Sequence, residues 1–260
     1  MSVAVLRFDV ISIFPAMFDA IAAHGITARA LERGLWQLQR WNPRDFTNDA
    51  YRSIDDRPYG GGPGMVMLAQ PLADAIAAAR AQQEAMPAAR RLPVLHLSPR
   101  GRPFDHERLL SLVEGGGATL IASRYEAVDQ RLLDTCVDEE VSVGDFVVSG
   151  GELPAMMMID AAVRLVPGAL NDDRSATEES FATGLLDCPQ YTRPERYRDL
   201  PVPEVLLSGH HARIARWRRE RALEITWQRR PELLQAARAA GRLSPVDERF
   251  LADIGAHERD

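Results

Sequence analysis

The segment 141–154, with the sequence VSVGDFVVSGGELP, constrains the fold more than any other part of the chain. Its apolar residues are typical of a buried strand: Val141, Val143, Phe146, Val147 and Val148. The ELP at its end places a carboxylate and a proline where helices begin. Gly144, Gly150 and Gly151 leave backbone groups open to a close neighbour, as at nucleotide-binding strand ends. A tight strand-to-helix turn without a ligand would explain the same pattern.

The composition is that of a globular protein with one large domain or two modest ones, because 260 residues can bury a sizeable core. All 31 basic residues are arginine, which excludes a lysine nucleophile, a Schiff base and a P-loop lysine. Cys136 and Cys188 form neither a disulfide framework nor a metal-binding motif. The sequence shows no signal-peptide pattern and no apolar run of membrane-spanning length. We therefore expect a cytoplasmic protein.

Strand-like and helix-like segments alternate as far as residue 166, which favours an α/β fold with a mostly parallel sheet covered by helices. The predicted strands lie at 3–14, 35–41, 93–97 and 118–123, followed by the run that starts at 141. The predicted helices lie at 16–23, 27–33, 69–85, 105–114, 129–138 and 154–166. Residues 42–64, which contain RPYGGGPG, are polar and irregular. We interpret 167–180, with its acidic stretch, as a flexible linker or lid.

Residues 181–260 have a different character, with predicted helices and no convincing strands. These helices lie at 204–208, 211–228, 231–240 and 244–254. The segment 211–230 carries seven arginines against two glutamates, although the whole chain has a net charge of −6. Such a local basic helix is a reasonable footprint for a phosphate backbone. A solvated helix face anchored by tryptophans is the ordinary alternative.

The sequence lacks the usual nucleotide-binding and hydrolase motifs. No G-x-G-x-x-G follows a strand, and there is no P-loop, nucleophile elbow or H-E-x-x-H. Three strand ends instead place small residues just after an apolar strand: LSPRG at 97–101, ASRYE at 122–126 and the segment 143–154. Ligands of open parallel sheets lie at this edge, so the three ends together predict a binding site.

These motifs resemble those of the bacterial tRNA (guanine-N1-)-methyltransferases of the TrmD type, which belong to the SPOUT methyltransferase class. The shared motifs keep the family's order over nearly the whole chain. They are RPYGGGPGMVM at 57–67, LSPRG at 97–101, RYE at 124–126, VGDFVVSGGELPAMMMIDAAVR at 143–164, ESFATGLLDCPQYTRPERY at 179–197 and VLLSGHHARIARWR at 205–218.

The resemblance implies an architecture that the sequence pattern alone does not reveal. Residues 1–166 would form an α/β domain tied in a trefoil knot that binds S-adenosylmethionine, and 181–260 a helical tRNA-binding domain after the 167–180 linker. The active site would lie at the interface of a homodimer, and the family's reaction is believed to need Mg²⁺. No metal ligand is assigned from the sequence. By motif position, the cofactor site would include Pro99, Ser123, Glu126, Val143, Gly144, Asp145, Phe146, Val147, Val148, Gly150, Gly151 and Pro154.

The implied reaction is methylation of guanine N1 at tRNA position 37, directly 3′ of the anticodon and preceded by another guanosine. Guanine N1 carries a proton, so it becomes nucleophilic only when a base removes that proton. By motif position that base is Glu179, and Arg164 would stabilise the charge that develops on O6. The loop around 55–64 would line the methionine end of the cofactor. Candidate tRNA contacts are His210, His211, Arg213, Arg216, Arg218 and Arg219.

The sequence departs from the family pattern at several of these positions. Glu179 stands where the family typically has aspartate, with Glu178 as the alternative base, and Phe146 replaces a tyrosine. Ser123 and Ala127 replace two glycines and add side chains beside the cofactor. Two other functions therefore stay open at this point: a non-catalytic RNA-binding factor with a disabled pocket, and a methyltransferase that acts at another RNA position.

Overall fold

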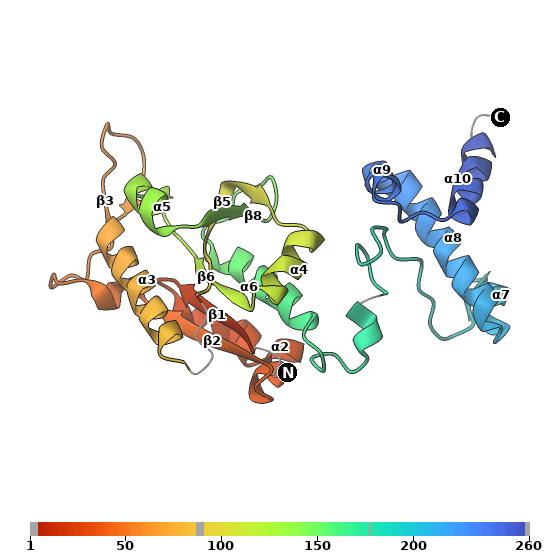
Figure 1. The fold of residues 1–260 in the computed structure, drawn as a ribbon, viewed down its shortest axis with the longest axis horizontal. Helices are drawn as coiled ribbons and strands as arrows, with labels where there is room; N and C mark the ends of the chain where they lie inside the picture. Colours follow the sequence, from red (N-terminus) through yellow and green to blue (C-terminus); the bar gives the residue numbers. More distant parts are fainter. Residues whose placement is uncertain (1–4, 87–90, 177, 258–260) are drawn as a thin grey trace. The chain divides into compact units, whose positions relative to one another are not determined.

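The computed structural model describes residues 5–86, 91–176 and 178–257. The first two residues of the predicted strand at 3–14 and residue 177 of the predicted linker lie outside the described residues. The chain divides into two compact units, Met1–Asp173 and Arg174–Asp260 (Figure 1). The division falls inside the predicted linker segment 167–180.

The N-terminal unit is built on a five-stranded sheet with the strand order β2-β1-β6-β5-β8, in which every neighbouring pair is parallel. Its strands are β1 (Leu6–Ile11), β2 (Trp36–Trp41), β5 (Val94–Pro103), β6 (Gly117–Ile121) and β8 (Glu139–Ser142). A second, small sheet contains β3 (Asp55–Asp56), β4 (Val66–Met67) and β7 (Ala127–Val128). The predicted α/β class with a parallel central sheet is confirmed.

Helices cover both faces of the five-stranded sheet (Figure 1). On one face lie α2 (Gly25–Glu32), α4 (His106–Glu114) and α6 (Glu152–Arg164). On the other lie α3 (Ala69–Glu84) and α5 (Gln130–Cys136). The connections contain η1 (Pro15–Phe18), α1 (Asp19–Ala22) and η2 (Pro43–Phe46).

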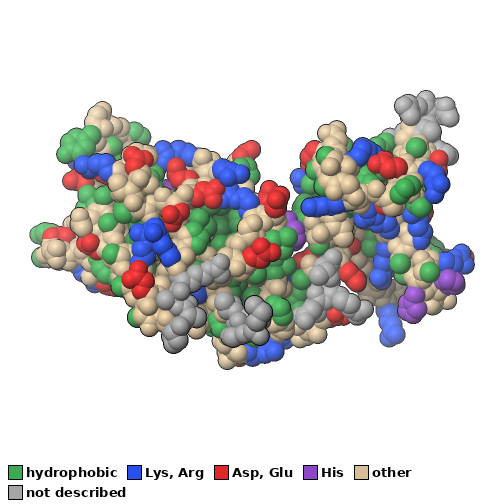
Figure 2. Space-filling model, in the orientation of Figure 1, with side chains coloured by type: hydrophobic (Ala, Val, Ile, Leu, Met, Phe, Trp, Pro, Cys, Tyr) green, Lys and Arg blue, Asp and Glu red, His purple; other side chains and the backbone are tan. Residues whose placement is uncertain are grey.

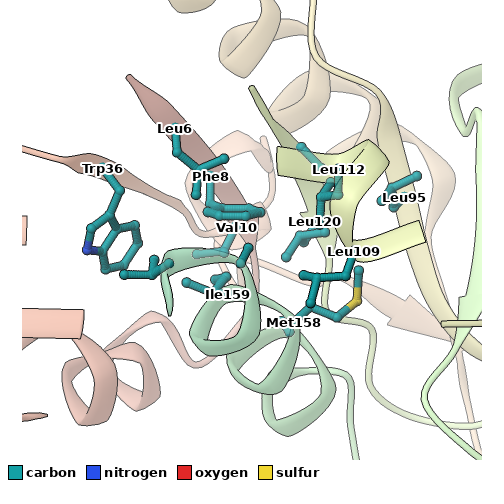
Figure 3. Packing of buried hydrophobic residues seen from close by; sticks show 14 of the residues in the cluster. Leu6, Phe8, Val10, Trp36, Leu95, Leu109, Leu112, Leu120, Met158 and Ile159 are labelled. Carbon is teal, nitrogen blue, oxygen red and sulfur yellow. The ribbon is translucent and has the colours of Figure 1, made fainter. Parts of the chain in front are cut away.

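Strand β1, the second in the sheet order, separates two hydrophobic cores, and all six of its residues are buried. Leu6, Phe8 and Val10 face the first core, where they pack with residues of α6 such as Ile159 (Figure 3). Ile11 points to the second core, which α3 and α5 complete. A parallel strand that is covered on both faces is expected to be apolar on both. β1 departs from this rule at Arg7 and Asp9, which are buried together as an ion pair at 2.7 Å.

The prediction that Val141 to Val148 form a buried strand is wrong beyond Ser142. There the Ser142 hydroxyl bonds to both the amide and the carbonyl of Gly144, whose φ of 152° turns the chain. Residues 143–151 then form a loop, in which Val147 is 84% exposed. The chain leaves the sheet edge and returns to the end of β6, where the Gly151 amide donates to the Ser123 carbonyl at 2.9 Å. The apolar sequence of this segment therefore belongs to an exposed loop.

The C-terminal unit contains α7 (Glu204–Leu207), α8 (His211–Arg229), α9 (Pro231–Ala239) and α10 (Pro245–His257), and η3 (Asp173–Ala176) lies at the division between the units. It also contains a hairpin of β9 (Arg196–Tyr197) and β10 (Leu200–Pro201). The expectation of no strands in this region is therefore wrong, because strands of two residues are too short to produce a periodic pattern. Leu185, Leu223, Leu234, Ala237 and Leu251 form the core of this unit.

Candidate functional site

A cavity of about 360 Å³ lies at the C-terminal edge of the sheet, where β5, β6 and β8 end. Its volume is within the range of small-molecule sites, and its position is the usual ligand position of open parallel sheets. Of the twelve predicted cofactor residues, Asp145 does not line the cavity. The other eleven do: Pro99, Ser123, Glu126, Val143, Gly144, Phe146, Val147, Val148, Gly150, Gly151 and Pro154.

The loop 143–151 is held in place by Arg124, which lies just after β6. Its guanidinium donates to the fully buried carboxylate of Glu152 at 2.9 Å and to the carbonyl of Ser149 at 3.1 Å. The second oxygen of Glu152 accepts from the Ser12 hydroxyl at 2.7 Å. Arg124 also lies over the ring of Phe14, 4.8 Å from its centroid. These contacts tie the ends of β1 and β6 to the first turn of α6, so the cavity wall is preorganised.

Two glycines are required by space rather than by an unusual backbone conformation. A Cβ on Gly151 would lie 2.7 Å from the Cα of Ala122, and one on Gly150 would lie 2.2 Å from Nε of Arg124. Neither glycine has a positive φ. The close approach of 150–151 to the end of β6 therefore depends on the absence of side chains, as the glycine pattern predicted.

A buried histidine lies beneath the cavity. His96, on β5, is 4% exposed; its Nδ1 lies 3.0 Å from a carboxylate oxygen of Glu140 and its Nε2 lies 2.8 Å from the Ser123 hydroxyl. Burial lowers the pKa of His96, and the hydrogen bond to Glu140 only partly opposes this effect. Glu140 is also held by Arg100 at 3.2 Å. Although burial alone would raise the pKa of Glu140, the hydrogen bonds from His96 and Ser98 and the charge of Arg100 leave it lowered.

The glycine-rich loop after Arg57 lies against the same cavity. A Cβ on Gly64, whose φ is 73°, would lie 2.3 Å from the side chain of Glu126, a lining residue. Tyr125, which also lines the cavity, has a raised pKa because of burial and its hydrogen bond to Asp55. The expected position of this loop beside the site is consistent with both contacts.

The predicted catalytic residues lie in different units. Arg164 is the last residue of α6 and is half-buried. Glu179 belongs to the C-terminal unit, where it is half-buried, whereas the alternative base Glu178 is exposed.

The predicted tRNA-contacting residues of α8 fall into two groups. Arg216 and Arg219 both bind Asp247 of α10, at 3.6 and 3.2 Å, and Asp247 is 4% exposed. In the described part of the chain, Arg213 and Arg218 form no ion pair. His210 and His211 are exposed at the start of the helix. Figure 2 shows basic side chains over the part of this unit that α8 occupies in Figure 1.

A second cavity of about 1000 Å³ lies in the C-terminal unit, beside α8. Tyr191 and Trp217 line it with their ring centroids 6.2 Å apart, together with Arg193 and Arg218. Tyr191 is exposed and Trp217 is half-buried. Accessible aromatic rings beside guanidinium groups are typical of surfaces on which nucleic-acid bases stack.

In the described ranges, 5–86, 91–176 and 178–257, no three His, Cys, Asp or Glu side chains gather as metal ligands would. No helix in these ranges combines the length and the apolar character that a membrane span needs.

Comparison with known proteins identifies the family. The model of the tRNA (guanine-1)-methyltransferase TrmD family matches residues 6–236. The chain is 56% identical over 255 residues to the tRNA (guanine-N(1)-)-methyltransferase of Burkholderia multivorans, covering 98% of this chain and 96% of that protein. It is 57% identical over 258 residues to the protein of the same name from Bordetella pertussis, covering 98% and 100%. The chain belongs to the TrmD family.

Membership of the TrmD family implies S-adenosylmethionine as the methyl donor, and the cavity fits such a group. Its walls combine apolar side chains with bare backbone at Gly150 and Gly151, which suits an adenine ring and its polar edge. Ser123 and Ala127 both line the cavity, yet about 360 Å³ remains open with these side chains present. The two departures from glycine therefore do not fill the cavity.

Sequence analysis missed several residues of this TrmD site. The sequence pattern predicts Glu152 only as an acidic residue at the start of a helix. In the structure its carboxylate is the buried ion-pair partner of Arg124. His96 and Glu140 were not singled out, because nothing in a strand sequence shows which side chains a parallel neighbour brings alongside. Their adjacent register in β5 and β8 makes the contact.

Proposed function

We propose that this protein transfers the methyl group of S-adenosylmethionine to N1 of guanine 37 in tRNAs that carry guanosine at the preceding position. The cavity at the C-terminal strand ends carries this proposal, since eleven of the twelve positions predicted from family motifs line one pocket. The identity of 56% to a protein named as a tRNA (guanine-N(1)-)-methyltransferase supports the same reaction.

The eleven lining residues would hold the donor mostly through backbone groups and apolar side chains. Bound S-adenosylmethionine supplies an electrophilic methyl group on a sulfonium, so the protein needs to supply alignment and a deprotonated N1. The loop 143–151 shapes one wall, and Arg124 fixes that loop through Ser149 and Glu152. Asp145 also belongs to this proposed set, although its side chain does not line the cavity.

Glu179 is the proposed general base for the N1 proton of guanine, and Arg164 the proposed partner of O6. A carboxylate matches the first task, and a guanidinium stabilises the negative charge that moves toward O6 as the proton leaves. Glu179 carries one methylene more than the family's aspartate. Its half-buried position favours it over the exposed Glu178.

The tRNA backbone would contact α8 and the cavity beside it. Arg213 and Arg218 are the preferred phosphate contacts because Arg216 and Arg219 are engaged by Asp247. His210 and His211 lie at the start of the same helix. Tyr191 and Trp217 add a surface on which an unpaired base can stack.

The site is proposed to be completed in a homodimer. Leu153 and Met157 lie one turn apart on α6 and are 51% and 56% exposed. The loop that precedes α6 carries two more exposed apolar side chains, Phe146 and Val147. Large exposed apolar side chains at a ligand site are typical of an interaction surface. A second copy of the chain is the occupant that the family resemblance implies.

The same resemblance supports three further parts of the proposal. The return of 143–151 from β8 to the end of β6 would form part of the proposed trefoil knot. Magnesium would be shared with substrate oxygens, as is usual for this ion. A tRNA substrate and two free thiols suit the cytoplasm.

Methyl transfer to an unmodified tRNA transcript tests the proposed function. The transcript carries GG at positions 36 and 37, and a matched transcript carries adenosine at position 37. We expect incorporation of one methyl group into the first transcript and none into the second, with the modified base identified as 1-methylguanine. Methylation elsewhere would favour another RNA position, and binding without methylation would favour a non-catalytic factor.

A further inference from the structure

Ser123 adds a hydroxyl to the wall of the proposed cofactor cavity. The related family motif has glycine here, but the backbone of Ser123 does not have a positive φ, so glycine is not required for conformation. The residue is half-buried and lines the cavity. Its carbonyl accepts from the Gly151 amide, and this hydrogen bond holds the backbone from which the side chain projects.

The hydrogen bonds around His96 determine which way the Ser123 proton points. An ionised Glu140 can only accept, so Nδ1 of His96 must donate across the 3.0 Å contact. A neutral imidazole then has no proton on Nε2, which accepts from the Ser123 hydroxyl at 2.8 Å. The only proton of the hydroxyl is thereby used inside the protein. The free lone pairs of its oxygen are left for the cavity.

We propose that Ser123, oriented by His96 and Glu140, is a specificity-determining hydrogen-bond acceptor in this cavity. It would accept from an O–H or N–H group on the nucleoside part of the methyl donor. This inference rests on the proposed function of the same site. The ligand group that faces Ser123 must therefore be a hydrogen-bond donor, such as a ribose hydroxyl or an exocyclic amine. His96 and Glu140 act through Ser123 and are positioning residues.

Protonation of His96 would reverse the polarity of this subsite. A proton on Nε2 makes the imidazole donate to Ser123, and the serine proton then turns toward the cavity, where it opposes a ligand donor. Among the described residues, two charged groups act on the imidazole: Glu140 on β8 and Arg100 further along β5. On the face of the sheet where His96 lies, α3 and α5 contribute an apolar cluster. The lowered pKa of His96 keeps the acceptor state dominant at neutral pH.

Equilibrium dialysis with labelled S-adenosylhomocysteine at pH 7.5, 6.5 and 5.0 tests this subsite. This ligand keeps the nucleoside but lacks the sulfonium charge, so hydrogen-bond polarity is measured by itself. For the unaltered protein we expect the affinity to fall as the pH decreases through the pKa of His96, approaching roughly a tenfold loss once the imidazole is protonated, as one reversed hydrogen bond would produce. Ser123→Ala and Ser123→Gly should bind several-fold more weakly at pH 7.5 and lose most of this pH dependence.

Ser149→Ala is the matched control, because Ser149 lines the same cavity but bonds to Arg124 instead of His96. It should keep the pH profile of the unaltered protein. Identical affinities and profiles for Ser123→Ala and the unaltered protein would overturn the inference while leaving the proposed function intact. Failure of the unaltered protein to bind at pH 7.5 would overturn both.

A titration of the His96 imidazole by NMR gives a second readout, which a purely structural serine would not affect. Because binding and protonation are linked, bound S-adenosylhomocysteine should lower the pKa of His96 by about one unit for a tenfold preference. In Ser123→Ala the ligand should cause little change. An unchanged His96 pKa on ligand binding to the unaltered protein would contradict the proposal.

Discussion

The guanidinium of Arg124 and the carboxylate of Glu152 form a buried ion pair at 2.9 Å, with Glu152 fully buried and the Arg124 side chain 19% exposed. The pair joins the residue after β6 to the first turn of α6. Because Arg124 also donates to the Ser149 carbonyl, the loop around the cavity depends on the same contact. Stability and the shape of the cofactor site are thus coupled through one guanidinium.

Glu152→Gln should lower the free energy of unfolding by about 3 kcal/mol, because it leaves a largely buried guanidinium without its counter-charge. Denaturant unfolding, followed by circular dichroism, measures this loss. Glu84→Gln is a matched control, since Glu84 is exposed at the end of α3. A loss no larger than that of the control would show that the pair does not hold the site together.

Gly151→Ala should weaken binding of S-adenosylhomocysteine at least tenfold, because its new Cβ would lie 2.7 Å from the Cα of Ala122 and force the cavity wall to shift. Calorimetric titration measures the affinity. Gly255→Ala is the corresponding control: Gly255 lies within α10, has open space at its Cβ and should tolerate alanine or gain helix stability. Equal binding by both variants would remove the close-approach argument for Gly151.

Helices such as α3 and α4 were predictable from the sequence, because each combines a strong apolar pattern with residues that mark where the helix begins or ends. The helix at 69–85 matches α3, and the helix at 105–114 matches α4 with Asp105 as its N-cap, whose side chain accepts from the Arg108 amide.

Residue composition was not sufficient where tertiary contacts decide the outcome. Phe146, Val147 and Val148 favour a strand by composition, but the turn at Gly144 and the anchor at Arg124 place them in a loop. The pairing of His96 with Glu140 depends on the register of two strands that are far apart in sequence. The resemblance to a family predicted which residues line the cavity. The residues that hold them in place could be identified only from the fold.

Glu179→Gln and Arg164→Ala should each reduce single-turnover methyl transfer by about 10²–10³-fold. The glutamine cannot take the N1 proton, and alanine cannot stabilise charge on O6. Both variants should still bind S-adenosylhomocysteine, because neither residue lines the cavity at the strand ends. Glu178→Gln is the control for the alternative base. Full turnover in Glu179→Gln, with a loss in Glu178→Gln, would transfer the role to Glu178.

Arg218→Ala and Arg219→Ala should have different effects although the residues are adjacent. Arg218 forms no ion pair in the described part of the chain, so its loss should weaken tRNA binding. The slope of log affinity against log salt concentration should decrease by about one, because one fewer counterion is released. Loss of Arg219 removes a partner of the buried Asp247 and should cost about 2 kcal/mol of stability. Filter binding over a salt series and thermal unfolding separate the two effects. Equal stability losses would contradict this division.

Met157→Glu should prevent formation of the proposed dimer and reduce methyl transfer, because it replaces an exposed apolar side chain of α6 with a charge. Sedimentation over a concentration series measures the association, and thermal unfolding checks that the monomer stays folded. Leu110→Glu is the control, since Leu110 is also exposed, at 42%, but lies on α4. A Met157→Glu protein that stays dimeric and active would rule out this face as the subunit interface.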